Sequence, residues 1–467
     1  MKLKQLFLAS LALASLASCS DNEGGVDIPD YKLIETSLSI SAIPNVGTIT
    51  RASELKDSET EVGAKGEAFV NTLTAIVFND DEAGLFSAIK TVKSTDGKSL
   101  DKIEDIVVKV QALEAGEVST SAFKVVLIAN VDNIEAPKDW ATFESSNFSG
   151  ILNYTFGGVN GKKQTQYLPM SSAVMKVKGL VAGTEYDNWI DTPTAIKVTP
   201  VKNVSNAKVT IVDNKVNQDA LDGEEYKVAE ANRISLIRYM ARVQLESLSA
   251  NFTQNYEDAK FELTSVSLAN VSNASLFVDG GSGLQCVLGS GENGAYADNA
   301  FYRGYPDKIV RADYYLAEGV YNAEIFSKSD YSDIVVDNKN TVEFADATTT
   351  TDKAVSMAQF YAFEFGSYDI AKDNNTGLSG NTAYTMLIIT GNITGVGPTK
   401  EARSFRIPIK HDANTNGVKR NYIYKVHATL TGEGTDNPDK NMLNAFVSFS
   451  IDVEQWQVIK QTETDVN

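Results

Sequence analysis

Short apolar runs, many of them β-branched, follow one another along the chain and are separated by glycine, asparagine and aspartate. Runs of this length predict strands, and no long stretch of helical periodicity lies between them. The pattern leaves room for a few short helices, and residues 80–93 are one candidate, because Leu85, Phe86 and Ile89 have helical spacing. The strands are expected over residues 69–78, 105–110, 123–129, 196–201, 208–212, 243–248, 261–268, 384–389, 405–409 and 422–430. The pattern therefore predicts an all-β protein of sandwiches with few short helices.

The polar and acidic stretch 214–232 is the best candidate for a domain boundary, because a new strand-rich half begins after it. The chain has 467 residues, which is enough for two or three separate cores. We expect one sandwich over residues 52–232 and a second over residues 233–467.

The first run after the N-terminal region alternates with a period of two. One face carries Ile34, Thr36, Leu38, Ile40 and Ala42, and the other carries Leu33, Glu35, Ser37, Ser39 and Ser41. A period of two predicts a strand that is buried on one face only.

Arg51 follows a second short β run and precedes Ala52 and a polar, charged segment. It is either an ordinary arginine at the end of a strand or a site of proteolytic cleavage. A polar, accessible segment is where a protease can enter a folded chain.

The N-terminus has the pattern of a bacterial lipoprotein signal. Lys2 and Lys4 precede an apolar run over residues 6–17, which is too short to span a bilayer. A small residue, Ser18, directly precedes Cys19, so we expect a signal peptide over residues 1–18 and acyl chains on Cys19. The alternative is an ordinary secretory signal that happens to contain a cysteine.

Composition and motifs argue against most chemistry. The formal net charge of −19 disfavours nucleic acid as a partner, because phosphates repel an acidic surface. The chain has two cysteines and two histidines, and His411 and His427 lie on a turn and a strand without a nearby serine or cysteine nucleophile. Residues 412–417 copy half of a calcium loop, but a β-turn explains them as well. We therefore predict no enzyme, no metal and no cofactor.

Several features together resemble the type V pilins, the fimbrillin family of Bacteroidales. They are the lipoprotein signal, the arginine after a first strand, and the segments ISLIRYMARV (residues 234–243), RNYIYKVHATLTG (420–432) and FSIDVEQWQVIKQ (449–461). The resemblance covers nearly the whole chain. It implies two tandem transthyretin-like β-sandwich domains, a lipid on Cys19, and a propeptide over residues 19–51 that ends at the bond between Arg51 and Ala52.

The resemblance also implies how such a protein assembles. An arginine-specific or trypsin-like protease removes the first strand, with Ile34, Leu38 and Ile40, from a precursor held at the cell outer membrane by its lipid. The vacated groove accepts a C-terminal strand from another pilin subunit. The product is an extracellular fimbrium that supports adhesion to a host or bacterial receptor.

The C-terminal end contains the candidates for the donor strand, which are Trp456, Val458 and Ile459. The rest of this tail is polar, so a tip or accessory subunit is an open interpretation beside a shaft subunit. The alternative function is a surface lipoprotein that stays anchored, either as a pilus anchor or as a sandwich that binds glycans or host proteins.

Overall fold

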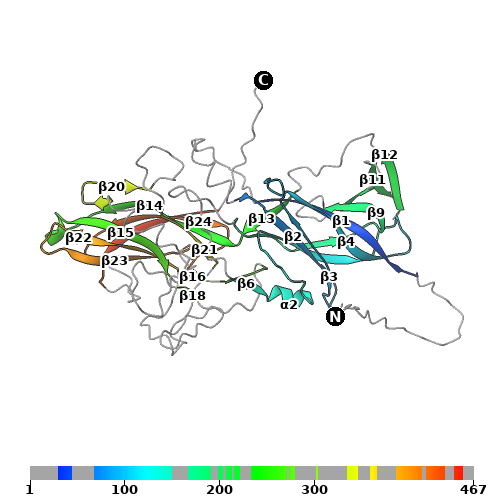
Figure 1. Cartoon of the computed structure of the whole chain (residues 1–467), viewed down its shortest axis with the longest axis horizontal. Helices are drawn as coiled ribbons and strands as arrows, with labels where there is room; N and C mark the ends of the chain where they lie inside the picture. The colour runs from blue at the N-terminus through cyan, green and yellow to red at the C-terminus, as the bar shows by residue number, and fades with distance from the viewer. Residues whose placement is uncertain are drawn as a thin grey trace, which may run out of the picture.

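The protein is described by a computed structural model. It describes residues 30–44, 68–149, 167–190, 198–202, 207–212, 215–220, 233–269, 271–272, 274–278, 301–302, 334–344, 358–364, 385–412, 417–436 and 446–455. These residues form mostly strands, as the sequence predicts, arranged along an elongated molecule (Figure 1). In this part of the chain no helix is both apolar enough and long enough to cross a lipid bilayer.

Twelve of the described strands are linked into one sheet system in the half that is on the right in Figure 1. Its order is β12-β11-β10-β9-β1-β13-β7-β5-β2-β3, with β4 on β1 and β8 on β5. The strands are β1 (Lys32–Pro44), β2 (Thr72–Asn79), β3 (Phe86–Lys93), β4 (Lys102–Ala112), β5 (Ala122–Ala129), β7 (Met170–Ser172), β8 (Met175–Lys178), β9 (Gly183–Ile190), β10 (Val198–Lys202), β11 (Ala207–Val212), β12 (Lys215–Ala220) and β13 (Ile234–Arg238).

Two further sheets form the left-hand half and enclose their own hydrophobic core. One has the order β20-β14-β24-β25 with β21 on β14, and the other has the order β19-β15-β22-β23. Their strands are β14 (Met240–Ala250), β15 (Lys260–Ala269), β19 (Val335–Val336), β20 (Thr341–Glu343), β21 (Ala358–Phe363), β22 (Met386–Thr394), β23 (Lys400–Pro408), β24 (Tyr422–Leu430) and β25 (Val447–Gln455).

Short elements lie between or beside these sheets. They are α2 (Trp140–Glu144), the 3₁₀ helix η3 (Gln254–Tyr256), and the strands β6 (Asn147–Ser149), β16 (Val271–Ser272), β17 (Ala274–Leu276) and β18 (Phe301–Tyr302). The pair β6–β17 joins residues from the two halves of the chain. A third hydrophobic cluster also draws on both halves, with Phe143 and Phe148 on one side and Tyr239 and Phe363 on the other.

The chain crosses between the halves at Tyr239, the residue between β13 and β14. Here the two segments ISLIRYMARV and RNYIYKVHATLTG meet. The amide oxygen of Asn421 accepts hydrogen bonds from the backbone N–H and the guanidinium of Arg238, at 3.3 and 3.2 Å. The Arg420 guanidinium lies 5.3 Å from the centre of the Tyr239 ring. The predicted boundary at 232 falls a few residues before this crossing, and the division into domains stays a prediction.

The candidate helix over residues 80–93 is wrong, because residues 86–93 form β3 and pair with β2. Gly84 adopts a φ of +55° in the turn before the strand, and its N–H donates to the Asp81 carboxylate at 2.8 Å. The spacing of Leu85, Phe86 and Ile89 is compatible with either element over so short a run. Pairing with a strand already present decides between the two.

Candidate functional site

The first strand occupies an unusual place for a chain end, because it is central in its sheet. Over residues 32–41 β1 pairs antiparallel with β4, and over residues 36–40 it pairs parallel with β9 on its other side. Its last residues, Ala42 to Pro44, pair parallel with β13. We call the place formed by β4, β9 and β13 around β1 the β1 slot. In Figure 1, β1 runs from the outer right-hand end towards the middle of the molecule.

One face of β1 supplies the hydrophobic contacts of the slot. Leu38, Ile40 and Ala42 are buried in the core of the right-hand half, and Ile34 is partly buried against it. The residues predicted for the removable strand, Ile34, Leu38 and Ile40, therefore lie together on one face.

The opposite face departs from the prediction, because it is buried as well. Ser37, Ser39 and Ser41 were expected to face solvent, yet all three are buried, and Ser39 is 0% exposed. The physical reason is that each hydroxyl has a hydrogen-bond acceptor inside the fold, so burial leaves none of them unsatisfied.

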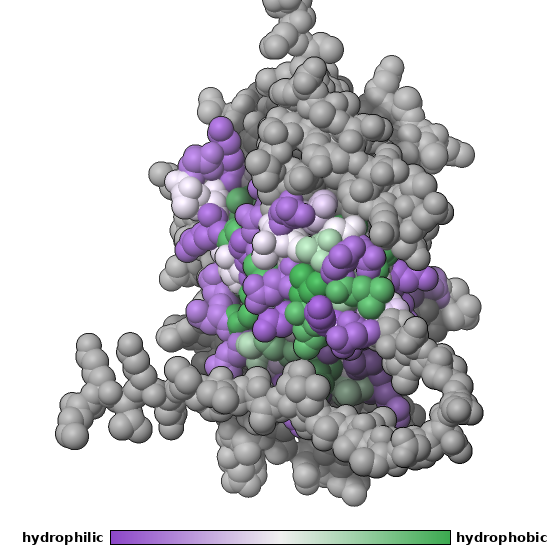
Figure 2. Space-filling model, turned by 90° about the vertical axis from the view of Figure 1, so that its right-hand side faces the viewer, coloured by the Kyte–Doolittle hydropathy of each residue, from purple (hydrophilic) through white to green (hydrophobic). Residues whose placement is uncertain are grey.

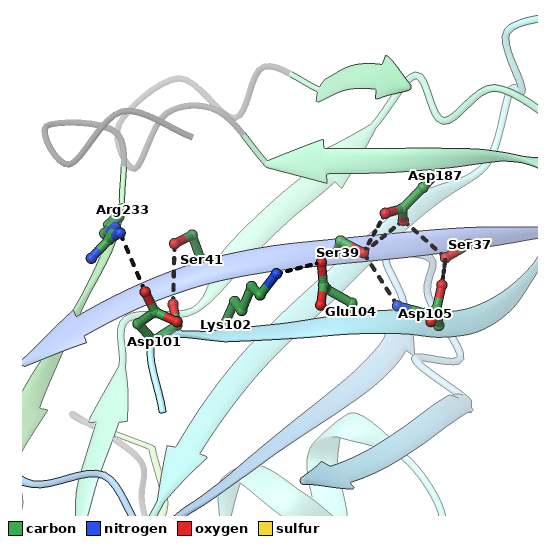
Figure 3. A network of polar contacts seen from close by, with 9 residues as sticks. All are labelled: Ser37, Ser39, Ser41, Asp101, Lys102, Glu104, Asp105, Asp187 and Arg233. Carbon is green, nitrogen blue, oxygen red and sulfur yellow. Dashed lines mark hydrogen bonds and ion pairs between the residues drawn. The ribbon is translucent and has the colours of Figure 1, made fainter. Parts of the chain in front are cut away.

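The acceptor at the centre of this face is the Asp187 carboxylate on β9 (Figure 3). Ser39 donates to its two oxygens at 2.6 and 2.8 Å, and Ser37 donates to one of them at 2.9 Å. Burial raises the pKa of Asp187 above its ordinary value, and the two serine hydroxyls offset this only in part. The nearby carboxylates of Asp105 and Glu104 raise it further.

Both neighbouring strands lose their regular register beside these serines. The β1–β4 register shifts between Leu38 and Ile40, where Asp105 has a φ of +53°. The Asp105 N–H donates to the Ser39 hydroxyl at 3.2 Å. The β1–β9 register shifts between Thr36 and Ser37. Side-chain hydroxyls therefore take part in pairing at the point where the backbone ladder is interrupted.

A second polar contact lies one residue further along β9. The Asn188 side-chain amide donates to the Thr36 hydroxyl at 3.0 Å and to the Ser37 carbonyl at 2.8 Å. Its own carbonyl accepts from the Val181 N–H at 2.8 Å, and Thr36 donates to the Val181 carbonyl at 2.7 Å. The group is buried, so it holds this part of β1 by specific rather than nonpolar contacts.

The end of the network approaches the surface. Ser41 donates to the Asp101 carbonyl at 3.1 Å, and the Asp101 carboxylate pairs with Arg233 at 3.3 Å. The Lys102 ammonium pairs with the Glu104 carboxylate at 2.9 Å. The two basic side chains in Figure 3, Arg233 and Lys102, therefore form ion pairs with Asp101 and Glu104. Nothing in the sequence singles out Asp187 or Asn188, which lie about 150 positions from β1.

Two hydrophobic residues of the strand pair β1–β4 are exposed. Leu33 at the start of β1 is 52% exposed, and Val107 on β4, opposite Ser37, is 56% exposed. Figure 2 looks onto the end of the molecule where β1 begins and shows hydrophobic residues interspersed with hydrophilic ones. A strand in the β1 slot therefore makes most of its apolar contacts with the buried core, through the positions of Leu38, Ile40 and Ala42.

The end of the described chain, β25, is an edge strand of the left-hand half. It pairs antiparallel with β24 and, among the described strands, with no other. Val447, Ile451 and Val453 pack partly buried against the core, while Phe446 and Phe449 are 42% and 40% exposed.

Several predicted positions lie outside the described residues. They are the lipid site Cys19, the cleavage site at Arg51 and Ala52, and the donor-strand candidates Trp456, Val458 and Ile459. The same is true of residues 413–416 of the calcium-like loop. The described residues contain no group of metal-ligating side chains that could hold an ion.

A serine does approach one histidine, contrary to the reading of the sequence. The Ser247 hydroxyl lies 2.9 Å from Nδ1 of His427, and Asp452 lies 3.5 Å from Nε2. This places the serine and the carboxylate on the opposite nitrogens from those used in a Ser-His-Asp triad. The three residues lie on the adjacent strands β14, β24 and β25, so they form a cross-strand polar row.

Comparison with known families identifies the region that contains the β1 slot. Residues 36–238 match the family described as "Major fimbrial subunit protein (FimA)". The match begins within β1 and ends at the last residue of β13, which is the extent of the right-hand sheet. Residues 36–238 are therefore assigned to this fimbrial family. The family consists of structural fimbrial subunits rather than enzymes, and the match supports a pilus component that has other pilin subunits as partners.

Solved structures resemble the chain over most of its length. One candidate cell adhesion protein from Parabacteroides distasonis has a TM-score of 0.52 at 15% identity, covering 92% of this chain and 99% of that one. A second from the same organism has a TM-score of 0.50 at 20% identity, covering 91% and 100%. These two support the fold. A fimbrilin from Porphyromonas gingivalis W83 gives a TM-score of 0.49 at 17% identity, covering 92% and 99%. No curated protein matches the sequence.

Proposed function

We propose that this protein is made as a surface lipoprotein and becomes a polymerising subunit when it loses β1. The observation that supports this is the position of β1. A strand near the start of the chain fills the centre of a sheet between β4 and β9. Such a strand leaves as one piece after a single cut, and its departure disturbs no later part of the chain's path.

Loss of β1 would create a strong acceptor for another strand. Backbone groups of β4 on one side and β9 on the other would be left unpaired. The core around Leu38 and Ile40 would also be opened, and each such side chain contributes about 1.5–3 kcal/mol when it is buried. A strand from a second subunit restores both kinds of contact, which is β-strand addition.

The remaining parts of the proposal come from the sequence. Acyl chains on Cys19 hold the precursor at the outer membrane, and an arginine-specific or trypsin-like protease cuts between Arg51 and Ala52. A C-terminal strand, for which Trp456, Val458 and Ile459 are candidates, then enters the slot of the next subunit. Because donor and acceptor lie in different places, such contacts do not close on themselves, and a filament grows.

A pair of variants tests this function. The precursor is treated with trypsin, and its mass is followed by denaturing and native gels. The native chain should be cut after Arg51 and should then form a ladder of high mass. Arg51→Ala should stay an uncut monomer, while Lys32→Ala, which removes another basic residue of the propeptide, should behave as the native chain. A protein that loses β1 and yet remains monomeric overturns the proposal.

A further inference from the structure

The serine face of β1 is buried around a carboxylate, and this arrangement has a consequence for what can replace β1. In the described structure, the hydrogen-bond donors to Asp187 are the hydroxyls of Ser37 and Ser39, which both belong to β1. Asp187 is 6% exposed, and it lies on β9 directly beside Ser37 of β1. When β1 leaves, the carboxylate loses these donors. A new strand must supply donors again or bury an unsatisfied carboxylate.

We infer that the β1 slot selects its incoming strand by hydroxyl side chains, with Asp187 and Asp105 as the specificity-determining residues. The occupant is the C-terminal end of a second copy of this chain, with residues 447–453, which precede the donor candidates Trp456, Val458 and Ile459, in the centre of the slot. The inference rests on the proposed exchange of strands and adds the chemistry that governs the exchange. Backbone pairing alone accepts any extended chain, whereas this site distinguishes one side chain from another.

The local geometry explains why hydroxyl groups are required. Ser39 both donates to Asp187 and accepts from the Asp105 N–H, so this position needs a group that does both (Figure 3). Serine and threonine have such a group. Valine would leave the buried carboxylate and the N–H without partners. Aspartate or glutamate would add a negative charge beside Asp187, Asp105 and Glu104, and is therefore rejected.

Strand β25 carries the same alternation as β1. Ser448, Phe449, Ser450 and Ile451 repeat the order hydroxyl, apolar, hydroxyl, apolar found at residues 37–40. In this alignment Ser450 takes the place of Ser39. Phe449, which is 40% exposed on β25, takes the buried place of Leu38.

The next position in the alignment places Asp452 where Ser41 now lies. Ser41 and Arg233 both contact Asp101, so a guanidinium lies next to this position. A carboxylate at that point is next to a cation, unlike a carboxylate at Ser39. The slot therefore accepts acid at the end next to β13 and excludes it at its centre.

The place of β25 in its own sheet favours it over other strands with alternating serines. β14 contains Ser247 and Ser249, but it pairs with β24, β20 and β21 and lies inside its sheet. β25 pairs with β24 on one side. An edge strand gives up one ladder on leaving, and in the slot it gains two.

The test uses the precursor cut after Arg51 and fluorescent peptides that compete for the slot. One peptide has the sequence of residues 32–44 and the other that of residues 446–455. Binding is followed by anisotropy. Both native peptides should bind. Ser39→Val in the first and Ser450→Val in the second should weaken binding at least 10-fold, while threonine at either position should retain it. Glu35→Val is the matched control, because Glu35 is exposed on the same face of β1.

A second protein variant assigns the effect to the carboxylate. In Asp187→Ala the penalty for valine should shrink, because only the Asp105 N–H is then left without its partner. If the alanine variant does not fold, Asp187→Asn removes the charge and should lower the penalty to a smaller extent. Failure of every peptide to bind overturns the proposed strand exchange itself. Binding of native and valine peptides with equal affinity leaves exchange intact but overturns selection by hydroxyl groups. Binding of the first peptide without the second overturns residues 447–453 as the occupant.

Discussion

Replacing Ile40 by alanine in the uncut chain should destabilise the right-hand half by about 2–5 kcal/mol. Ile40 is 0% exposed and lies in the core with residues of β2, β4 and β5. It pairs with Ile103 on β4 and with Ile190 on β9, so the cavity left by the substitution is enclosed by strands on both sides. Strands on both sides keep this cavity from closing, so we expect a destabilisation in the upper part of the range of about 2–5 kcal/mol.

The effect is measurable by urea unfolding with tryptophan fluorescence. Trp189 is a local reporter, because it lies on β9 opposite Ser39 and is 6% exposed. With a slope of about 2–3 kcal/mol per molar urea, the midpoint should fall by about 1–2 M while the slope stays constant.

Leu33→Ala is the matched control on the same strand. Leu33 is 52% exposed, so its loss should change stability by no more than about 0.5 kcal/mol. Equal midpoints for the two variants would refute the reasoning, because they would mean that β1 is not an integral part of the core.

Three further outcomes follow from individual contacts. Asn188→Ala should cost about 1–3 kcal/mol by thermal unfolding, because the buried Val181 N–H loses its acceptor, whereas exposed Glu185→Ala should cost nearly nothing. The pKa of Asp187 is raised in the folded state, so protonation of its carboxylate favours folding. Compared with Asp187→Asn, the native chain should therefore become more stable as the pH falls through the raised pKa, and the gain should level off below 3.8. A gain in stability as the pH rises would contradict the assignment. Gly391→Ala should lower the free energy of unfolding by at least about 1–3 kcal/mol, because the new methyl would lie 2.3 Å from the Glu262 carbonyl oxygen. Gly397→Ala meets nothing within 4 Å, so its cost is the backbone strain at a φ of +68°, about 1–2 kcal/mol. Equal urea midpoints for the two variants would contradict this order.

Alternation along the sequence was sufficient to predict β1 and its hydrophobic face, because burial of Leu38 and Ile40 depends only on their parity in a strand. It could not predict the burial of Ser37 and Ser39. A serine can be either buried or exposed, and which of the two occurs depends on whether a hydrogen-bond partner lies nearby in the fold. The partner of Ser39, Asp187, lies 148 residues away in the sequence. Polar networks across long separations have no local signature.

The strand β3 shows a different limit of sequence reasoning. Residues 80–93 contain apolar positions that satisfy a helical spacing and an extended pairing alike. The choice was made by β2, whose Ile76 lies opposite Ile89 in the sheet. Residues 447–453 also alternate, but the sequence does not show that β25 lies at an edge and pairs on one side only in the described fold.

The crossing at Tyr239 has a mechanical consequence for a filament of such subunits. β13 and β14 are separated by this one residue, so tension applied along the molecule passes from one half to the other through an almost continuous extended backbone. β13 pairs antiparallel with β7, and β14 pairs parallel with β24. Hydrogen bonds that run across the strands are then pulled in shear and must yield together rather than one by one. Each subunit should therefore resist extension at the crossing between its two halves, and elongation under flow would begin elsewhere.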